Sequence, residues 1–463
     1  MTLSIPRATE PADPEGATYH VPAPAATVRP ATVRAADVRA TRHVPDADAW
    51  PDVARPPRAR PGHTAAARLL IGRALARLPL RVRLGDGPAT GSGPGLQVHR
   101  PDAFFERVGS QGLIGFGESY MAGDWDSDDL PGLLTVLALH VDDLVPAPLR
   151  RLRGAWTRHR PQTHRNSVAG SRENVRRHYD LSNELFELFL DETMTYSSAV
   201  FTSFPARQEG LATAQHRKID RLLDLAAVGS ATRLLEIGTG WGELALRAAA
   251  RGADVVTVTL STEQRDLAVR RVAEAGLTHR VDVRLCDYRE VTGTYDAVVS
   301  VEMIEAVGAD FWPGYFRALR AALAPGGRIA LQAITMPHER MLNTSRTHTW
   351  ISKYVFPGGL IPSREAIEAN AAGAGLRTVS DHGYGDHYAE TLRLWRERFT
   401  AHAQQVGELG FDATFRRMWE LYLAYSEAGF RSHYLDVRQI LMCASASGTS
   451  PTPRGSRGQE HTP

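Results

Sequence analysis

The chain has 463 residues and a formal net charge of +2; 43% of its residues are hydrophobic and 23% are charged. These values are ordinary for a soluble globular protein of two or three domains, and they give no reason to expect nucleic acid as a partner. The two cysteines, Cys286 and Cys443, exclude a disulfide framework and a Cys-rich zinc site. No run approaches the roughly 18 apolar residues of a membrane span, and the N-terminus lacks the apolar region of a secretory signal. We therefore expect a cytoplasmic protein.

The first 62 residues are rich in Ala, Pro and Arg and are predicted to be disordered. A small domain is expected over 64–148. It opens with "AAARLLIGRALARLPLRVRL", where apolar residues recur at helical spacing between arginines. This pattern favours an amphipathic helix docked on its own domain and followed by a strand, over a helix that lies on an anionic membrane.

A basic linker is expected over 149–177. This linker contains nine arginines and one acidic residue, Glu173. Such a one-sided charge run favours attraction to phospholipid headgroups, which would place the protein peripherally on the inner face of the membrane. Nothing near it resembles a base-reading motif. The tail, 445–463, is predicted to be disordered like the head.

The remainder, 178–444, alternates strand-like apolar runs with helical patterns. This alternation predicts an α/β fold with a doubly wound, mostly parallel sheet. "APGG" at 324–327 is expected to end a helix and turn into a strand. The strand-like runs are 233–238, 254–260, 281–286, 295–301 and 327–334.

A glycine loop, "LLEIGTGWGEL", follows the first of these strands. Gly238, Gly240 and Gly242 allow a tight turn and close approach to a ligand. The dinucleotide fingerprint would need a third glycine at the position of Glu243. The acidic Glu236 suits the ammonium of S-adenosyl-L-methionine (AdoMet), which has no pyrophosphate to bind. The loop therefore favours AdoMet over NAD.

Polar residues also follow the next two strands. Thr259 and Gln264 in "TLSTEQ" are candidates for hydrogen bonds to ribose, and Asp287 and Tyr288 in "CDYRE" for contacts with adenine. Because parallel strands end at the same sheet edge, these loops predict one cofactor crevice.

Several long motifs then identify a family resemblance. They include "GFGESYMAGDWDSDDL", "HYDLSNELFELFLDETMTYSSAVF", "VSVEMIEAVG", "YVFPGGLIPS" and "HYAETLRLWRERF". Over about 70–444 the chain resembles the cyclopropane-fatty-acyl-phospholipid synthase family, which includes the mycolic-acid cyclopropane synthases. The resemblance implies a Rossmann-like methyltransferase domain, a lipid-engaging N-terminal domain, AdoMet as cofactor and a homodimer. It also implies transfer of a methyl(ene) group to the cis double bond of a phospholipid-bound acyl chain, forming a cyclopropane ring.

Two alternatives stay open: the same substrate with a methylene or methyl branch and no ring, and methylation of a soluble metabolite. The resemblance maps cofactor contacts onto Tyr196 and Ser197, onto Leu235, Glu236, Ile237, Gly238, Thr239, Gly240, Trp241, Gly242 and Glu243, onto Thr259, Leu260, Ser261, Thr262, Glu263 and Gln264, and onto Tyr288.

The resemblance further implies a bicarbonate ion that acts as base. Its positions here are Ser198, Glu305, Gln332, Ile334 and Tyr388. Ser198 and Gln332 depart from the cysteine and histidine of the family, which puts bicarbonate in doubt. Glu305 is expected to organise the base and to receive a hydrogen bond from Tyr388.

Glu302 lies three residues before Glu305 and is additional to the family pattern. It is either a helix start favoured by the macrodipole or a local replacement for the missing histidine. Aromatic faces would stabilise the positive charge that forms when an alkene is methylated, and the candidates are Tyr388, Tyr196 and Trp241. For Trp241, core packing is the alternative.

Overall fold

The structure is a computed structural model that describes residues 43–56, 62–141, 182–206, 209–345 and 347–445. Of the head predicted to be disordered, 1–62, residues 1–42 and 57–61 lie outside the described residues, whereas 43–56 are described and include the helix Pro51–Ala54 with a buried Val53. The predicted linker at 149–177 and the predicted tail from residue 446 also lie outside the described residues.

A seven-stranded sheet forms the centre of the C-terminal part, in the order β6-β5-β4-β7-β8-β10-β9. Every neighbouring pair is parallel except those that involve β10, which runs antiparallel to β8 and β9. The predicted mostly parallel sheet is therefore confirmed. The strands are β4 Arg233–Ile237, β5 Asp254–Thr259, β6 Val281–Leu285, β7 Tyr295–Val301, β8 Leu323–Thr335, β9 Leu376–Gly383 and β10 Asp436–Ala444.

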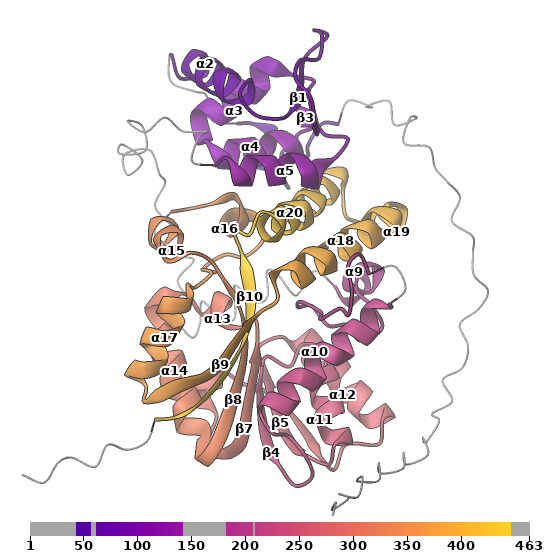
Figure 1. The fold of residues 1–463 in the computed structure, drawn as a ribbon. Coiled ribbons are helices and arrows are strands. Elements are labelled where there is room, and N and C mark those ends of the chain that lie inside the picture. The colour runs from indigo at the N-terminus through magenta and orange to yellow at the C-terminus, as the bar shows by residue number, and fades with distance from the viewer. Residues whose placement is uncertain (1–42, 57–61, 142–181, 207–208, 346, 446–463) are drawn as a thin grey trace, which may run out of the picture. The chain divides into compact units, whose positions relative to one another are not determined.

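Helices cover both faces of this sheet (Figure 1). On one face α10 (Leu211–Leu225), α11 (Glu243–Ala250) and α12 (Thr262–Glu274) pack on strand residues such as Leu234. On the other face α14 (Trp312–Ala322) and α17 (Arg364–Gly373) pack on residues such as Leu235. Consecutive residues of β4 thus enter different cores, as the pleat of a doubly covered strand requires.

Two details of the sheet differ from the expectation. β9 and β10 were not predicted from the sequence. The "APGG" segment, expected as a turn, lies inside β8: Tyr295 pairs with Leu323 and Ala297 with Arg328, so the four residues 324–327 form a bulge opposite β7. α14 nevertheless ends at Ala322, directly before it, as expected.

The N-terminal elements include a small sheet of β1 (Arg81–Leu84), β2 (Gly95–Val98) and β3 (Trp125–Asp126). The expected helix followed by a strand is observed as α2 (His63–Leu75) and β1. α2 contacts α3 and buries Leu75, which supports docking on its own part of the chain. Accompanying helices are α1 (Pro51–Ala54), α3 (Pro101–Gln111), α4 (Leu113–Met121) and α5 (Leu130–Leu139).

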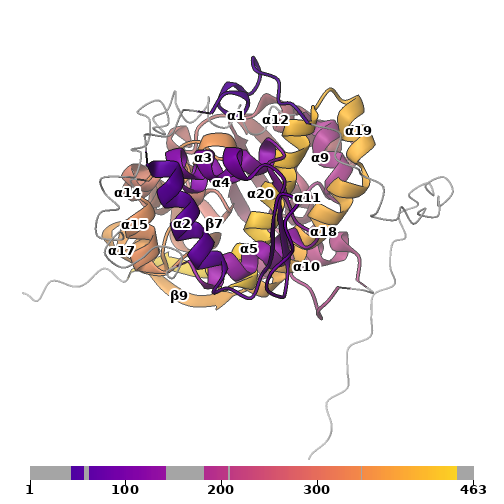
Figure 2. The same cartoon turned by 90° about the horizontal axis from the view of Figure 1, so that it is seen from above.

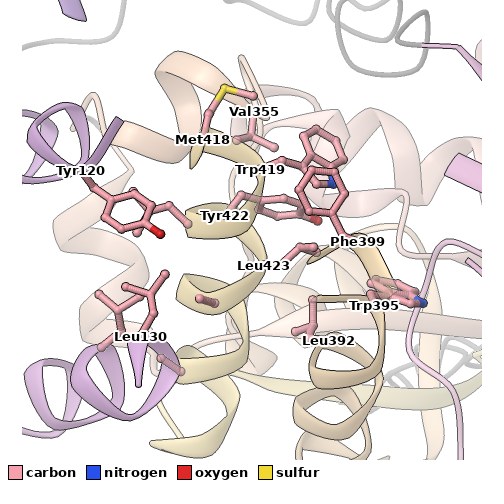
Figure 3. Close-up of a cluster of buried hydrophobic side chains, with 14 of the residues drawn as sticks. Tyr120, Leu130, Val355, Leu392, Trp395, Phe399, Met418, Trp419, Tyr422 and Leu423 are labelled. Atoms are coloured by element: carbon pink, nitrogen blue, oxygen red, sulfur yellow. The ribbon is translucent and has the colours of Figure 1, made fainter. Parts of the chain in front are cut away.

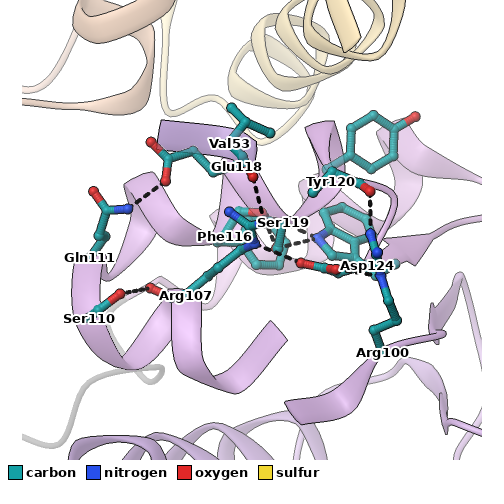
Figure 4. A network of polar contacts seen from close by, with 12 residues as sticks. Val53, Arg100, Arg107, Ser110, Gln111, Phe116, Glu118, Ser119, Tyr120 and Asp124 are labelled. Atoms are coloured by element: carbon teal, nitrogen blue, oxygen red, sulfur yellow. Dashed lines mark hydrogen bonds and ion pairs between the residues drawn. The ribbon is translucent and has the colours of Figure 1, made fainter. Parts of the chain in front are cut away.

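A buried ionic network holds these N-terminal elements together (Figure 4). Asp124, 1% exposed, receives Arg107 Nε at 2.9 Å and Arg100 Nε at 2.7 Å. The Arg107 guanidinium also donates to the Val53 carbonyl at 2.6 Å. Because each cation satisfies a carboxylate or carbonyl that burial removes from water, the network fixes α1, α3 and the loop before β3 together.

Long helices near the C-terminus pack against these N-terminal elements. α20 (Ala413–Arg431) contacts α4, α5 and α18 (Gly385–Ala401), and Figures 1 and 2 show α4 and α5 beside α20. In Figure 3 Tyr120 and Leu130 lie on one side of α20, whereas Trp419 and Leu423 point to its other side, toward the labelled side chains of α18. The shared apolar core joins α18 and α20 to the N-terminal elements. Further helices are α9 (Asn183–Phe189), α13 (Ile304–Val307), α15 (His338–Thr344), α16 (Trp350–Tyr354) and α19 (Ala403–Glu408).

Among the described residues, no helix combines the length and the hydropathy needed to cross a bilayer.

Candidate active site

The glycine loop leaves the carboxyl end of β4 with three glycines of positive φ at alternate positions. Their φ angles are +96° at Gly238, +52° at Gly240 and +95° at Gly242. A Cβ at Gly238 would lie 2.7 Å from Met303 Cγ, whereas one at Gly240 would meet no atom within 4 Å. The loop therefore rests on the turn after β7 on one side and opens to free space at Gly240, as a backbone cradle for a ligand requires.

The polar residues after β5 organise their own loop. Thr259 Oγ1 donates to Gln264 Oε1 at 2.8 Å, and Ser261 Oγ caps α12 by accepting from the Gln264 amide at 3.2 Å. Ser261 also donates to Glu263 Oε2 at 3.0 Å. The expected ribose-binding pair thus lies together at the expected strand end, held by mutual hydrogen bonds.

After β6, Asp287 and Tyr288 are fixed by Arg289. The Arg289 guanidinium donates to both Asp287 oxygens at 2.7 and 2.6 Å and lies 5.3 Å from the Tyr288 ring centroid. Asp287 also caps the short helix Tyr288–Glu290. The sequence did not predict this salt bridge, which makes Asp287 an organiser of the loop as well as a candidate adenine contact.

Two residues mapped onto the cofactor loop have structural partners instead. The Trp241 ring is 2% exposed, lies 4.9 Å from Phe186 between centroids and donates to Asn183 Oδ1 at 2.7 Å. These contacts favour core packing, the alternative to stabilisation of a cation, as the role of Trp241. The Glu243 carboxylate receives His216 at 2.9 Å and Arg271 at 2.6 Å, so it ties α11 to α10 and α12.

The Glu236 side chain is buried and accepts a hydrogen bond from Thr257 Oγ1 at 2.7 Å. Burial raises the pKa of Glu236 to about 8, against the hydrogen bond and the attraction of Lys218. Thr257 also bonds Thr239 of the glycine loop at 2.7 Å. Glu236 therefore stabilises the glycine loop through the hydrogen bonds of Thr257 and Thr239.

Lys218 is a buried cation that the sequence reasoning missed. Its Nζ donates to Ser197 Oγ at 2.6 Å, and burial lowers its pKa to about 8 against the attraction of Glu302, Asp191 and Glu236. The signal was available, because Lys218 follows Leu211 and Gln215 and precedes Leu222 at helical spacing on the apolar face of α10. A charged residue on such a face needs a polar partner.

The segment 195–198 lies next to Lys218 and is held through its own backbone carbonyls. Gln215 Nε2 donates to the Thr195 and Ser197 carbonyls at 3.2 and 2.8 Å. The Tyr196 hydroxyl lies 2.7 Å from that of Tyr422, and the Tyr196 ring lies 5.2 Å from Trp395 between centroids. Tyr196 is thus one wall of an aromatic cluster beside the polar site.

Glu302 is the centre of the polar site. Its Oε1 accepts from the Ser198 amide at 2.9 Å and from Gln332 Nε2 at 2.8 Å, and its Oε2 accepts from the Tyr388 hydroxyl at 2.6 Å. The N-cap of α13 is Met303, and the Glu302 side chain makes no cap. The helix-start hypothesis for Glu302 is therefore wrong, while its contact with Gln332 fits the alternative.

The expected bond from Tyr388 to Glu305 is also wrong, because the Tyr388 hydroxyl donates to Glu302. Burial raises the pKa of Glu302, and the hydrogen bonds from Tyr388, Ser198 and Gln332 oppose that rise. Burial and the negative Glu302 together raise the pKa of Tyr388, so its hydroxyl stays protonated and acts as a donor.

Glu305 lies on α13 beside this centre. Its Oε1 accepts from the Ile334 amide, while its Oε2 is buried and has no hydrogen-bond partner in the described structure. Burial, reinforced by repulsion from Glu302, raises the pKa of Glu305 to about 8. Ser198, Glu305, Gln332, Ile334 and Tyr388 are therefore brought together as predicted, but around Glu302.

A chain of hydrogen-bonded side chains holds the Gln332 amide in place. Gln332 Oε1 accepts from Gln439 Nε2 at 3.0 Å, and Gln439 Oε1 accepts from Arg221 Nε at 3.3 Å. This chain fixes which end of the Gln332 amide faces Glu302, because the oxygen is already used. Gln439 belongs to β10, a strand the sequence did not predict.

Comparison with known proteins now decides the family. The family model described as mycolic acid cyclopropane synthetase matches residues 166–440. This chain belongs to that family. A family member from Mycobacterium tuberculosis, the tuberculostearic acid methyltransferase UfaA1, is 57% identical over 406 residues, which are 85% of this chain and 95% of the relative. The cyclopropane-fatty-acyl-phospholipid synthase of Escherichia coli is 32% identical over 76% of this chain and 88% of its own length.

Solved structures of the mycolic acid cyclopropane synthetase family agree. The cyclopropane synthase MmaA2 from Mycobacterium tuberculosis superposes with a TM-score of 0.54 at 30% identity, covering 58% of this chain and 97% of that one. CmaA1, complexed with SAH and CTAB, gives 0.54 at 29% identity, covering 61% and 98%. The chain is an AdoMet-dependent methyltransferase, and the loop that opens at Gly240 fits that cofactor.

Bicarbonate, in contrast, does not fit the residues present. Three donors were expected to hold bicarbonate, and all three donate to the Glu302 carboxylate instead; they belong to Ser198, Gln332 and Tyr388. The amide of Ile334 is taken by Glu305. A free anion would also lie beside the Glu302 carboxylate, whose charge repels it.

Proposed function

We propose that this enzyme transfers the AdoMet methyl group to one carbon of a cis double bond in a phospholipid-bound acyl chain and releases a methylene-branched chain without ring closure. The observation that carries the methyl transfer and the following proton loss is the Glu302 carboxylate, which is held by three donors next to Met303, the residue beside the glycine loop. The absence of ring closure is argued from the comparisons.

An alkene is a weak nucleophile, so the site must exclude water and align the reactants. AdoMet supplies an electrophilic methyl group. Aromatic rings form an apolar surface that excludes water. The centroid of the Tyr388 ring lies 4.5 Å from that of Phe430 and 6.1 Å from that of Trp395. Such faces stabilise the carbocation that forms on the acyl chain when the double bond gains a methyl group.

The carbocation must lose a proton to become neutral. If the added methyl group loses it at once, the electron pair of the C–H bond closes a cyclopropane ring onto the cationic carbon. If a hydride first moves from the methylated carbon to its cationic neighbour, the same proton loss forms a double bond between the methylated carbon and the added carbon, which is a methylene branch. One base therefore serves both outcomes, and the hydride shift decides between them.

The branched outcome is supported by the 57% identity with UfaA1, which is named a methyltransferase of tuberculostearic acid and not a cyclopropane synthase. The methylene product needs no reductant, whereas a saturated methyl branch needs a further two-electron reduction. The closed-ring outcome is favoured by the E. coli relative, at lower identity.

A phospholipid carrier, attachment at the inner face of the membrane and a homodimer remain predictions. The apolar core that α20 shares with the N-terminal elements supports a role for those elements in substrate presentation, because it couples them to the helices beside the site. The alternative of a soluble metabolite is disfavoured by the same aromatic, apolar surroundings of Tyr388.

The test is the structure of the lipid product after expression in a host rich in oleoyl phospholipids. The ring and the methylene branch are isomers, so mass spectrometry shows the gain of one CH₂ and NMR must distinguish them. Vinylidene protons support the proposal. Cyclopropane ring protons would overturn the branch, and an unchanged lipid pool with a methylated soluble product would overturn lipid methylation.

A further inference from the structure

We propose that the Glu302 carboxylate is a built-in base: it accepts the proton from the transferred methyl group and takes the place of the free anion that the resemblance implies. This inference rests on the proposed function and deepens it. Glu302 then acts directly on the reacting carbon, while Glu305 has a separate role.

The donors around Glu302 form a complete anion site that is already filled. They come from three separate parts of the chain: the backbone of the 195–198 segment at Ser198, the Gln332 amide of β8 and the Tyr388 hydroxyl of α18. Ser198 and Gln332 are 2% and 1% exposed. Buried donors of this kind need an acceptor, and the chain itself provides one.

The backbone of Glu302 is held in a conformation that a glutamate rarely adopts. Its φ angle is +52°, in the left-handed region that favours glycine. A non-glycine residue in this region is strained. The Glu302 amide donates to the Gln332 carbonyl at 2.8 Å, which pins the strained turn at the end of β7. In this backbone conformation the Glu302 side chain points toward its three hydrogen-bond donors and not along α13.

The charges nearby favour one carboxylate held in this place over a diffusible one. Lys218 attracts the Glu302 charge, whereas burial raises the pKa of Glu305 to about 8 and so favours its neutral form. A free anion would lose its own entropy on binding at this place, but a tethered carboxylate has already met that cost during folding.

The proposed step is balanced without a co-reactant. After the hydride shift, a C–H bond of the new methyl group breaks, and its electron pair forms the carbon–carbon double bond to the cationic carbon. The proton goes to a carboxylate oxygen of Glu302, which becomes a neutral acid. Water takes this proton between turnovers, and the charged Glu302 is restored.

Two substitutions at this residue test the idea. Glu302→Gln keeps the shape and the contacts with Ser198 and Tyr388 but removes the base. Glu302→Gly removes the side chain and suits the positive φ, so it should fold and leave the three donors open to a small anion. Activity is measured by product NMR in buffer freed of carbon dioxide, with and without added bicarbonate. Bicarbonate and AdoMet binding are measured separately by calorimetry.

The wild-type enzyme should work equally well without bicarbonate and should bind none. Both variants should lose about 10²–10⁴-fold in turnover while binding AdoMet normally. Bicarbonate should bind to Glu302→Gly and restore at least about tenfold of its activity, but should do neither with Glu302→Gln. Full activity of Glu302→Gln, or loss of wild-type activity on removal of bicarbonate, would overturn this inference alone. A wild-type enzyme that methylates no acyl chain would overturn the proposed function instead.

Discussion

The Tyr388 hydroxyl donates a 2.6 Å hydrogen bond to Glu302 Oε2 and so joins the first turn of α18 to the carboxyl end of β7. Hydrogen bonds to a charged acceptor are worth about 1.5–3 kcal/mol. This bond therefore influences both the position of the Glu302 carboxylate and the pH at which it ionises.

Tyr388→Phe should shift the acidic limb of the pH–rate profile upward. The Tyr388 bond lowers the pKa of Glu302, which burial raises, so its loss lets that pKa rise further. A base must be deprotonated to act, so kcat/KM should fall most at low pH. Tyr425→Phe, at a half-exposed position of α20, is the control. An unshifted limb in Tyr388→Phe would show that Glu302 does not set the profile.

Gly240→Val should abolish AdoMet binding measured by calorimetry. The Gly240 φ of +52° strains any β-branched residue, and the new side chain would enter the space open beside the loop. Gly276→Val is a matched control, because Gly276 also has a positive φ, +69°, and open space at its Cβ, but lies between α12 and β6. Both variants should lose stability, and only the first should lose the cofactor. Unchanged affinity in Gly240→Val would refute the assignment of the loop.

Glu305→Gln should change how stability depends on pH. Burial raises the pKa of Glu305 to about 8 in the folded chain, above the ordinary value of 4.5. Between these values the folded state binds a proton that the unfolded state has released. The free energy of unfolding therefore falls as pH rises through this window, by about 1.4 kcal/mol per pH unit for this group.

The glutamine variant cannot ionise, so this part of the pH dependence should vanish and the variant should gain stability relative to the wild type between pH 5 and pH 8. Chemical denaturation at both pH values measures the effect. Equal slopes in the two proteins would mean that Glu305 ionises normally in the folded chain.

Arg417→Ala should separate the N-terminal elements from α20. The Arg417 guanidinium donates to the carbonyls of Tyr120 and Trp125 and to Asp126 at 2.6–2.9 Å, and lies 4.0 Å from the Tyr120 ring centroid. The Arg417 and Asp126 side chains are 22% and 40% exposed, so the loss should be that of the hydrogen bonds to a charged group, about 1.5–3 kcal/mol. Urea denaturation should show this loss, while Arg416→Ala, whose guanidinium makes none of these contacts, should cost about 0.5 kcal/mol or less. Equal effects of the two substitutions would argue against the docked arrangement.

The sequence by itself determined the five parallel strands, the glycine loop and the family. These are local properties, because apolar runs, turn residues and motif order are written in adjacent positions. It also placed Ser198, Gln332, Ile334 and Tyr388 in one site, although only through the resemblance.

Only the tertiary structure decided what Glu302 and Glu305 do. Their spacing in the sequence made them a pair, but Glu302 reaches donors 104 and 86 residues away at Ser198 and Tyr388, whereas Glu305 turns to Ile334. Lys218 and Gln439 acquired their roles in the same way, through contacts between distant elements. A carboxylate takes its function from the donors, charges and burial that surround it, and these exist only once the chain has folded.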